Sequence, residues 1–174
     1  FVTPALALTY SNEGLSGSSR NFHKWARQYK IANGNTPRKI LLNSWEGVYF
    51  DINQEGMDQM MADIASMGGE LFVMDDGWFG DKYPRKNDSS SLGDWVVDER
   101  KLPEGIEGLL RDAKKHGIKF GLWIEPEMTN TTSELYEQHP DWILKAPLRE
   151  PVLGRGGTQL VLDLANPEVQ DFVF

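Results

Sequence analysis

An alternation of short apolar runs with helical patterns, beginning near residue 38, constrains the fold of this chain more than any other feature. The runs at 39–45, 70–74 and 119–124 have the length and apolar content of strands in a buried parallel sheet. Between them, apolar residues recur at helical spacing, first at Met57, Met60, Met61 and Ile64 and then at Ile106, Leu109, Leu110 and Ala113. This order predicts a parallel α/β sheet with right-handed crossovers.

A doubly wound sheet and a (β/α)8 barrel both satisfy that order. No glycine-rich phosphate-binding motif follows an expected strand, which disfavours the nucleotide-binding folds. A complete barrel takes ~250 residues, so a barrel of this kind would be under half complete in a chain of 174 residues.

Residues 1–37 are expected to be a lead-in to this α/β region. Residues 1–10 are mostly apolar and could form a strand, 11–20 are rich in Ser, Gly and Asn and predict a loop, and 22–31 could form a short helix. A clear break follows at 34–37.

The last third of the chain carries weaker signals. We expect a short helix at 133–139, a short strand at 159–164, and a helix that starts at 166–168 with a capping Asn, a Pro and an acidic residue. The long polar segment at 77–104 is expected to be a functional or mobile loop.

Charge and cysteine content narrow the function classes. The net charge of −8 argues against nucleic acids and anionic membranes as partners, because both are negatively charged. The sequence has no cysteine, no leading signal segment and no apolar run near the ~20 residues of a membrane helix. We therefore expect a cytoplasmic protein without disulfides. Because the sequence starts at Phe1 and ends in the apolar 172–174, we also expect it to be cut at both ends.

Aromatic and acidic residues gather where each expected strand ends. The first strand ends in Asn43–Glu46, the second in Asp75–Trp78 and the third in Trp123–Glu127. Active sites of parallel α/β folds lie at the carboxyl ends of the strands. Strand alternation places Trp123 and Glu125 on the face opposite the helices. The sequence therefore predicts one site at this edge.

Tryptophans and carboxylates without a basic cluster suit a neutral, polyhydroxylated ligand. The apolar C–H faces of a sugar can lie on an indole ring, and carboxylates can accept hydrogen bonds from its hydroxyls. Asp75 and Asp76 are not the catalytic pair of a retaining glycosidase, because neighbouring strand residues point to opposite faces and cannot straddle one bond. They are better placed to bind two hydroxyls of one sugar.

The same residues also admit ordinary structural roles. Asp75 and Asp76 could cap a turn, Trp45 and Trp123 could be core aromatics, and Arg155 could be a solvated turn residue between glycines.

Other acidic residues and the histidines leave further alternatives open. Glu125 and Glu127 could form salt bridges, and Asp94–Trp95 could serve loop packing. A metal site is conceivable, but carboxylates without histidine are unspecific; its ligands would be Asp75, Asp76, Glu125 and Glu127. The histidines follow no ligand spacing and are expected at the surface or at helix ends; they are His23, His116 and His139.

Five motifs, taken in order, closely resemble the microbial α-galactosidases of glycoside hydrolase family 36, and the likeness covers residues 1–174. They are Asn43-Ser44-Trp45-Glu46, Phe72 to Gly80, Leu92-Gly93-Asp94-Trp95, Gly121 to Met128, and Leu160 to Leu164.

The resemblance implies a partial (β/α)8 TIM barrel, with 38–174 as its first strands and helices and 1–37 as the linker from a β-rich domain. It implies retaining hydrolysis of terminal α-galactosyl residues of oligosaccharides, without a cofactor. The whole protein could be a homo-oligomer. By the same likeness the substrate-binding residues are Trp45, Asp75, Asp76, Trp123 and Arg155.

The family's nucleophile belongs to a Lys-Trp-Asp type motif, which this sequence does not contain. We therefore assign no catalytic residue and expect the 174-residue chain to be inactive by itself. A raffinose-synthase-like transglycosidase and an α-N-acetylgalactosaminidase share much of this scaffold and stay open as alternatives. So do a non-catalytic sugar-binding protein and a carboxylate-metal barrel enzyme.

Overall fold

The computed structural model describes residues 2–174 and divides into two compact units, Phe1–Arg38 and Lys39–Phe174. The first unit contains one helix, α1 (Gly14–Tyr29), while 2–10 form neither helix nor strand. The expected strand at 1–10, apart from Phe1, which lies outside the described residues, was therefore wrong. A strand needs a neighbour for its backbone groups, and none pairs with this segment within residues 2–174.

The expected loop at 11–20 was also wrong, because α1 begins at Gly14 rather than near Phe22. Ser and Asn cost a helix only a few tenths of a kcal/mol each, so a polar composition does not prevent helix formation. Gly17 is the buried residue of α1, and a Cβ at this position would collide with the side chain of Ser11. The glycine that suggested a loop instead allows the preceding chain to pack against the helix.

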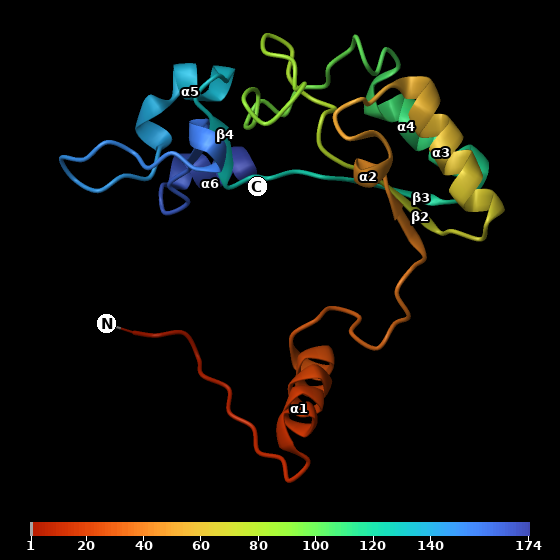
Figure 1. The fold of residues 1–174 in the computed structure, drawn as a ribbon, viewed down its shortest axis with the longest axis vertical. Helices are drawn as coiled ribbons and strands as arrows, with labels where there is room; N and C mark the ends of the chain where they lie inside the picture. The colour runs from red at the N-terminus through yellow and green to blue at the C-terminus, as the bar shows by residue number, and fades with distance from the viewer. Residues whose placement is uncertain (1) are drawn as a thin grey trace. The chain divides into compact units, whose positions relative to one another are not determined.

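Three parallel strands form the centre of the second unit, in the order β1 (Leu41–Asn43), β2 (Leu71–Met74) and β3 (Lys119–Leu122). Two helices, α3 (Gln54–Ser66) and α4 (Gly105–His116), lie side by side along the sheet in Figure 1. The predicted strand–helix–strand–helix–strand order is confirmed.

Alternation along the strands separates a helix-facing side from an open side. Phe72 and Met74 of β2 are fully buried in the same core as Met57, Met61 and Leu109 of the two helices. The intervening Val73 pairs in register with Asn43 and with Gly121, so these three share the opposite face. That face continues into the strand ends where the site was expected.

Local capping fixes the start of α3 and the end of α4. The Asn53 Oδ1 accepts a hydrogen bond from the Gly56 N–H at 2.8 Å at the start of α3. Gly117 follows α4 with a φ of 73°, the left-handed conformation in which glycine carries no Cβ penalty.

A second, antiparallel pair of strands, β4 (Met128–Asn130) and β5 (Gln159–Val161), lies beyond an extended stretch that follows β3 (Figure 1). The strand expected at 159–164 is present at Gln159–Val161, and its ladder partner is β4, which the sequence did not predict. Single antiparallel bridges also join Gln159 to Gly154 and Leu162 to Ile143. Short helices surround the pair: α5 (Glu134–Gln138), η1 (Pro140–Trp142), η2 (Arg155–Gly157) and α6 (Pro167–Val173). Their separate core consists of Leu135, Trp142, Ile143, Leu160, Leu162 and Val169.

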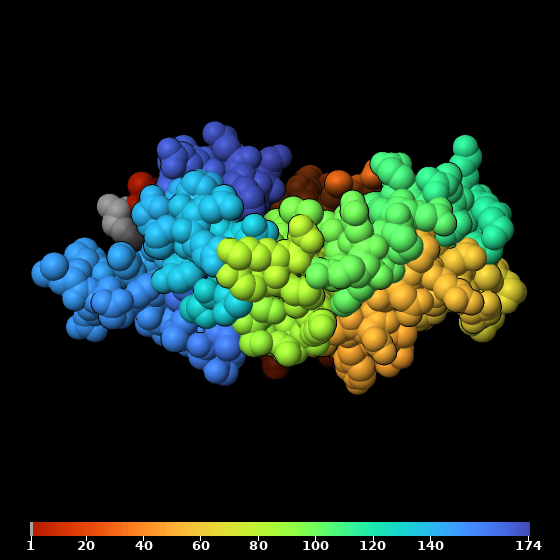
Figure 2. Space-filling view, turned by 90° about the horizontal axis from the view of Figure 1, so that it is seen from above, coloured from red at the N-terminus to blue at the C-terminus, as the bar shows by residue number. Residues whose placement is uncertain are grey.

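The long segment between β2 and α4 is packed rather than loose. Trp78, Phe79, Leu92 and Leu102 are buried along it, although it contains neither a helix nor a regular strand. Figure 2 shows this segment, in yellow-green, between α5 and the pair of helices α3 and α4. A four-residue helix, α2 (Trp45–Val48), follows β1 where the strand was expected to continue. Within residues 2–174, every helix is too short or too polar to span a bilayer.

Candidate functional site

The ends of the three parallel strands bring Trp45, Asp75 and Trp123 to one edge of the sheet. Backbone pairing continues past the strands, because Ser44 N–H donates to the Val73 carbonyl at 3.0 Å and Trp123 N–H to the Met74 carbonyl at 2.9 Å. The buried Ser44 hydroxyl also accepts from the Asp75 N–H at 3.0 Å. These contacts lock the strand ends together at the level of Asp75.

Asp75 is partly buried and belongs to the open face of the sheet. Its Oδ2 accepts a hydrogen bond of 2.6 Å from Asn43 Nδ2, the residue in register with Val73, and its Oδ1 accepts from the Asp76 N–H at 2.8 Å. The contact with the Asp76 N–H is of the kind expected if Asp75 caps a turn, the structural role that the sequence left open. Each carboxylate oxygen has two lone pairs, so the group retains capacity for ligand hydroxyls.

Asp76 lies deeper and carries an ion pair with Arg85. Arg85 Nε is 2.8 Å from Oδ1 and Nη2 is 2.7 Å from Oδ2, and the side chains are 0% and 5% exposed. The other guanidinium donor, Nη1, binds the Ser90 carbonyl at 2.8 Å and Asn130 Oδ1 at 3.0 Å. Arg85 is thus fixed by Asp76 just after β2, by Asn130 of β4 and by the Ser90 carbonyl of the long loop.

Arg85 is the main residue of this site that sequence analysis did not find. An arginine in a polar loop is usually solvated, and the residues next to Arg85 in the sequence do not indicate that its side chain is buried. Its partners are distant in the sequence, with Asn130 lying 45 positions away.

Arg155 stands before β5, as expected, on the turn at 154–157. Its side chain is 57% exposed, and Nη1 lies 3.1 Å from Asp88 Oδ1. Asp88 Oδ1 also lies 3.5 Å from Arg85 Nη2. Acidic and basic residues therefore alternate from Asp76 through Arg85 and Asp88 to Arg155.

The two tryptophans of the expected site are both partly buried. Trp123 packs against Trp95, with ring centroids 6.4 Å apart, and its carbonyl accepts from Trp78 Nε1 at 3.0 Å. Trp45 makes edge contacts with Tyr49 and Phe50, at centroid distances of 5.2 and 5.0 Å. Each ring thus has a packing role and also some exposed surface.

Glu125 follows Trp123 by two residues and is partly buried. Burial raises the pKa of its carboxyl, an effect that the charge of Arg155 opposes and the charge of Glu127 reinforces. Within residues 2–174, no three or more His, Asp or Glu side chains come together in a group suited to hold a metal ion.

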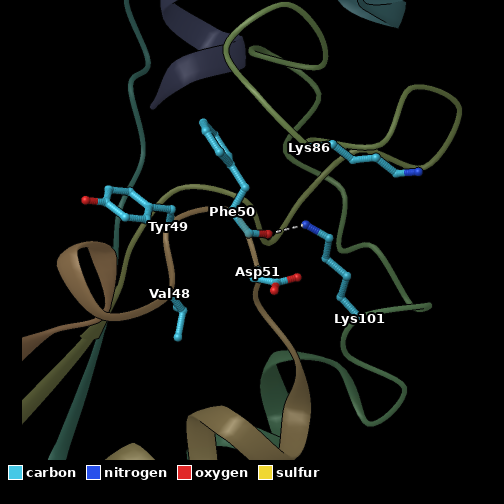
Figure 3. A pocket seen from close by; sticks show the side chains of 6 residues that line it. All are labelled: Val48, Tyr49, Phe50, Asp51, Lys86 and Lys101. Carbon is cyan, nitrogen blue, oxygen red and sulfur yellow. Dashed lines mark hydrogen bonds between the residues drawn. The ribbon is translucent and has the colours of Figure 1, made fainter.

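A cavity of about 420 Å³ lies beside Trp45, lined by Val48, Tyr49, Phe50, Asp51, Lys86 and Lys101. In Figure 3 the Lys101 side chain extends to the Phe50 carbonyl, with an Nζ–O distance of 2.8 Å. The same ammonium donates to the carbonyls of Gly77 at 2.6 Å and Arg85 at 3.0 Å. Burial lowers the pKa of Lys101, and nearby aspartates oppose that shift. One cation therefore ties the chain after α2 to two points of the long segment between β2 and α4.

Asp94 serves the structural role considered for it. Its two carboxylate oxygens accept from the Glu134 and Leu135 N–H groups, both at 2.9 Å, at the first turn of α5. Burial raises the pKa of Asp94, and these two hydrogen bonds oppose the shift.

Comparison with known proteins identifies relatives over the full length of the chain. Residues 1–174 match the family described as Melibiase. "Probable alpha-galactosidase C" of Aspergillus oryzae is 46% identical over 181 residues, covering 99% of this chain and 24% of the relative. "Alpha-galactosidase AgaA" of Geobacillus stearothermophilus is 45% identical over 176 residues, covering 99% and 23%.

Solved structures of α-galactosidases resemble this chain as well. The crystal structure of a variant of AgaA from Geobacillus stearothermophilus in complex with stachyose superposes with a TM-score of 0.85 at 44% identity, covering 94% of this chain and 22% of that one. A second variant, in complex with raffinose, gives the same values. The chain thus spans about a quarter of the length of the relatives it matches. These neighbours confirm the expected fold class, a partial (β/α)8 barrel.

Proposed function

Because the chain belongs to the Melibiase family, among the α-galactosidases of glycoside hydrolase family 36, we propose that it forms the first part of the catalytic barrel of a retaining α-galactosidase. Its substrates would be oligosaccharides with a terminal α-galactosyl residue. Raffinose and stachyose are the natural first choices, since the related AgaA variants were solved in complex with them. Residues 1–37 would connect this barrel segment to a preceding β-rich domain.

One observation carries the proposal: Asp75 lies, incompletely buried, at the carboxyl edge of the parallel sheet, between Asn43 and the segment that begins with Trp123. A carboxylate held there by neighbouring strands is preorganised to accept hydroxyl hydrogen bonds. The open surfaces of Trp45 and Trp123 supply aromatic faces for the C–H side of a sugar.

Asp76 and Arg155 complete the proposed substrate-binding set. Both oxygens of Asp76 bind Arg85, so a sugar hydroxyl would use the remaining lone pairs of a carboxylate that is already fixed. Arg155 is exposed, and the N–H groups that do not bind Asp88 could donate to a ligand beside the strand ends.

The bond-breaking groups lie outside this set. A retaining glycosidase needs two carboxyl groups ~5–5.5 Å apart on opposite sides of the bond. Asp75 and Asp76 are sequence neighbours, and the second of them is bound to Arg85. We propose that the nucleophile and the acid/base belong to later strands of the barrel.

The test is an assay of the full-length protein that carries this chain, with raffinose as substrate. Galactose should be released, and proton NMR should detect the α-anomer first because the mechanism retains configuration. Initial release of the β-anomer would contradict the retaining mechanism. Transfer of galactose to another sugar without free galactose would favour the transglycosidase alternative.

A further inference from the structure

Asp88, in the middle of the long loop, binds two parts of the second sheet. Its backbone carbonyl accepts hydrogen bonds from Asn130 Nδ2 in β4, at 2.9 Å, and from Thr158 Oγ1 just before β5, at 3.2 Å. Its carboxylate points to Arg85 and Arg155. The backbone of Asp88 therefore anchors the loop, while its side chain places an anion between two arginines.

Arg155 is paired with that anion. Among the described residues, Asp88 is the acidic residue whose carboxylate oxygen lies within 4.0 Å of a nitrogen of the Arg155 side chain. The side chain is otherwise exposed, and a long exposed arginine populates many rotamers unless a partner selects one. The backbone is also held in an uncommon state, because the φ of Arg155 is 39°, in the left-handed region, and two glycines with positive φ follow it.

The Asp88 carboxylate also connects two residues of the proposed sugar site. Arg85 Nη2 lies 2.7 Å from Asp76 Oδ2 and 3.5 Å from Asp88 Oδ1, which in turn lies 3.1 Å from Arg155 Nη1. The two ends of this chain of charges come from the residues just after β2 and from the turn before β5, and β2 and β5 belong to different sheets. Interactions within such a network are coupled and do not add independently.

We propose that Asp88 is a positioning residue of the galactoside site: its carboxylate holds the Arg155 guanidinium in the orientation that contacts the sugar and couples it, through Arg85, to Asp76. This inference rests on the proposed function. Asp88 itself acts through the arginines and does not touch the substrate. Because its side chain is 49% exposed, substitution should not disturb the core.

The experiment is a double-mutant cycle in the full-length protein with raffinose as substrate. Asp88→Asn keeps the shape and the backbone contacts but removes the charge, and it should raise KM about three- to tenfold while kcat changes less than about twofold. Asp88→Glu, which restores the anion, should recover part of this loss. Arg155→Met removes the cation that Asp88 holds; it should raise KM by itself, and adding Asp88→Asn to it should then change KM less than about twofold.

A matched control is Glu104→Gln, which neutralises the carboxylate of another exposed ion pair, with Arg111 at 2.5 Å, and should leave kinetics unchanged. Additive effects of the two substitutions, or wild-type KM for Asp88→Asn, would overturn the positioning role. A lowered Tm with unchanged KM would show a purely structural residue and would overturn it as well. Absence of α-galactosidase turnover in the wild-type protein would instead overturn the proposed function, and this inference with it.

Discussion

Arg85 and Asp76 form a two-pronged ion pair that is closed off from solvent, with Nε–Oδ1 at 2.8 Å and Nη2–Oδ2 at 2.7 Å. Burying both charges carries a desolvation cost, so such a pair need not stabilise the fold more than apolar residues would. Its importance appears when one partner is lost, because the other charge is then buried without compensation. Asp76 is therefore a structural residue whatever its contact with the sugar.

Arg85→Met should destabilise the fold by about 3–5 kcal/mol, since it leaves the Asp76 carboxylate buried and unpaired. Thermal unfolding of the full-length protein would show this as a lower Tm. The double variant Arg85→Met with Asp76→Leu should recover part of the loss, because no unpaired charge remains. Wild-type Tm for the single variant would contradict the buried pair.

Asp75→Ala should lower kcat/KM on raffinose at least about tenfold, because a hydrogen bond to a charged group contributes about 1.5–3 kcal/mol. Asp76→Ala should have a similar kinetic effect but should also lower the Tm, for the reason given above. Glu150→Gln, at an exposed position, is the control for a lost surface charge. If Asp75→Ala retained wild-type kinetics, the role of the Asp75 carboxylate would be limited to stabilising the turn at the end of β2.

The 174-residue chain expressed alone should show no turnover of a chromogenic α-galactoside above background. Binding residues cannot replace the two carboxylates that share bond breaking in a retaining mechanism. Turnover that survives repurification and disappears with Asp75→Asn would show that catalytic residues lie within these 174 positions.

Asp94→Ala should lower the Tm of the full-length protein, because two N–H groups at the start of α5 lose their acceptor. Losing a helix cap costs about 0.5–2 kcal/mol. Asp94→Asn retains one carbonyl oxygen and should lose less. Equal losses for the two variants would indicate that the charge, rather than the hydrogen bonds, is what matters.

Glu125→Gln tests the pH dependence that follows from burial. Because the pKa of Glu125 is raised on folding, its protonated form is favoured in the native state. That stabilisation is complete below the ordinary glutamate pKa of about 4.3 and is lost as pH rises through the folded value. The uncharged variant should therefore gain stability relative to the wild type between pH 4 and 7. Since the side chain is only partly buried and solvent screens its charge, the gain should be a few tenths of a kcal/mol. A Tm difference that stays constant across this range would contradict the burial effect.

The sequence predicted the elements whose signals are local. The methionine spacing predicted α3, and the apolar run through Phe72 and Met74 predicted β2, so pattern and packing agree there. Strand-end residues could also be placed, since parallel strands bring their carboxyl ends to one edge.

Features that depend on distant partners could not be read from the sequence. Strand β4 has three residues and exists through its pairing with β5, about thirty positions later. Arg85 is buried because Asp76 and Asn130 reach it from other elements.

Lys101 has a consequence for how this region can evolve. Its three acceptors are the backbone carbonyls of Phe50, Gly77 and Arg85, and every residue type supplies such a carbonyl. The identity of a residue can therefore drift at Phe50 without losing the tie to Lys101, whereas a change at Lys101 breaks three ties together. Aligned relatives should consequently vary more at position 50 than at position 101.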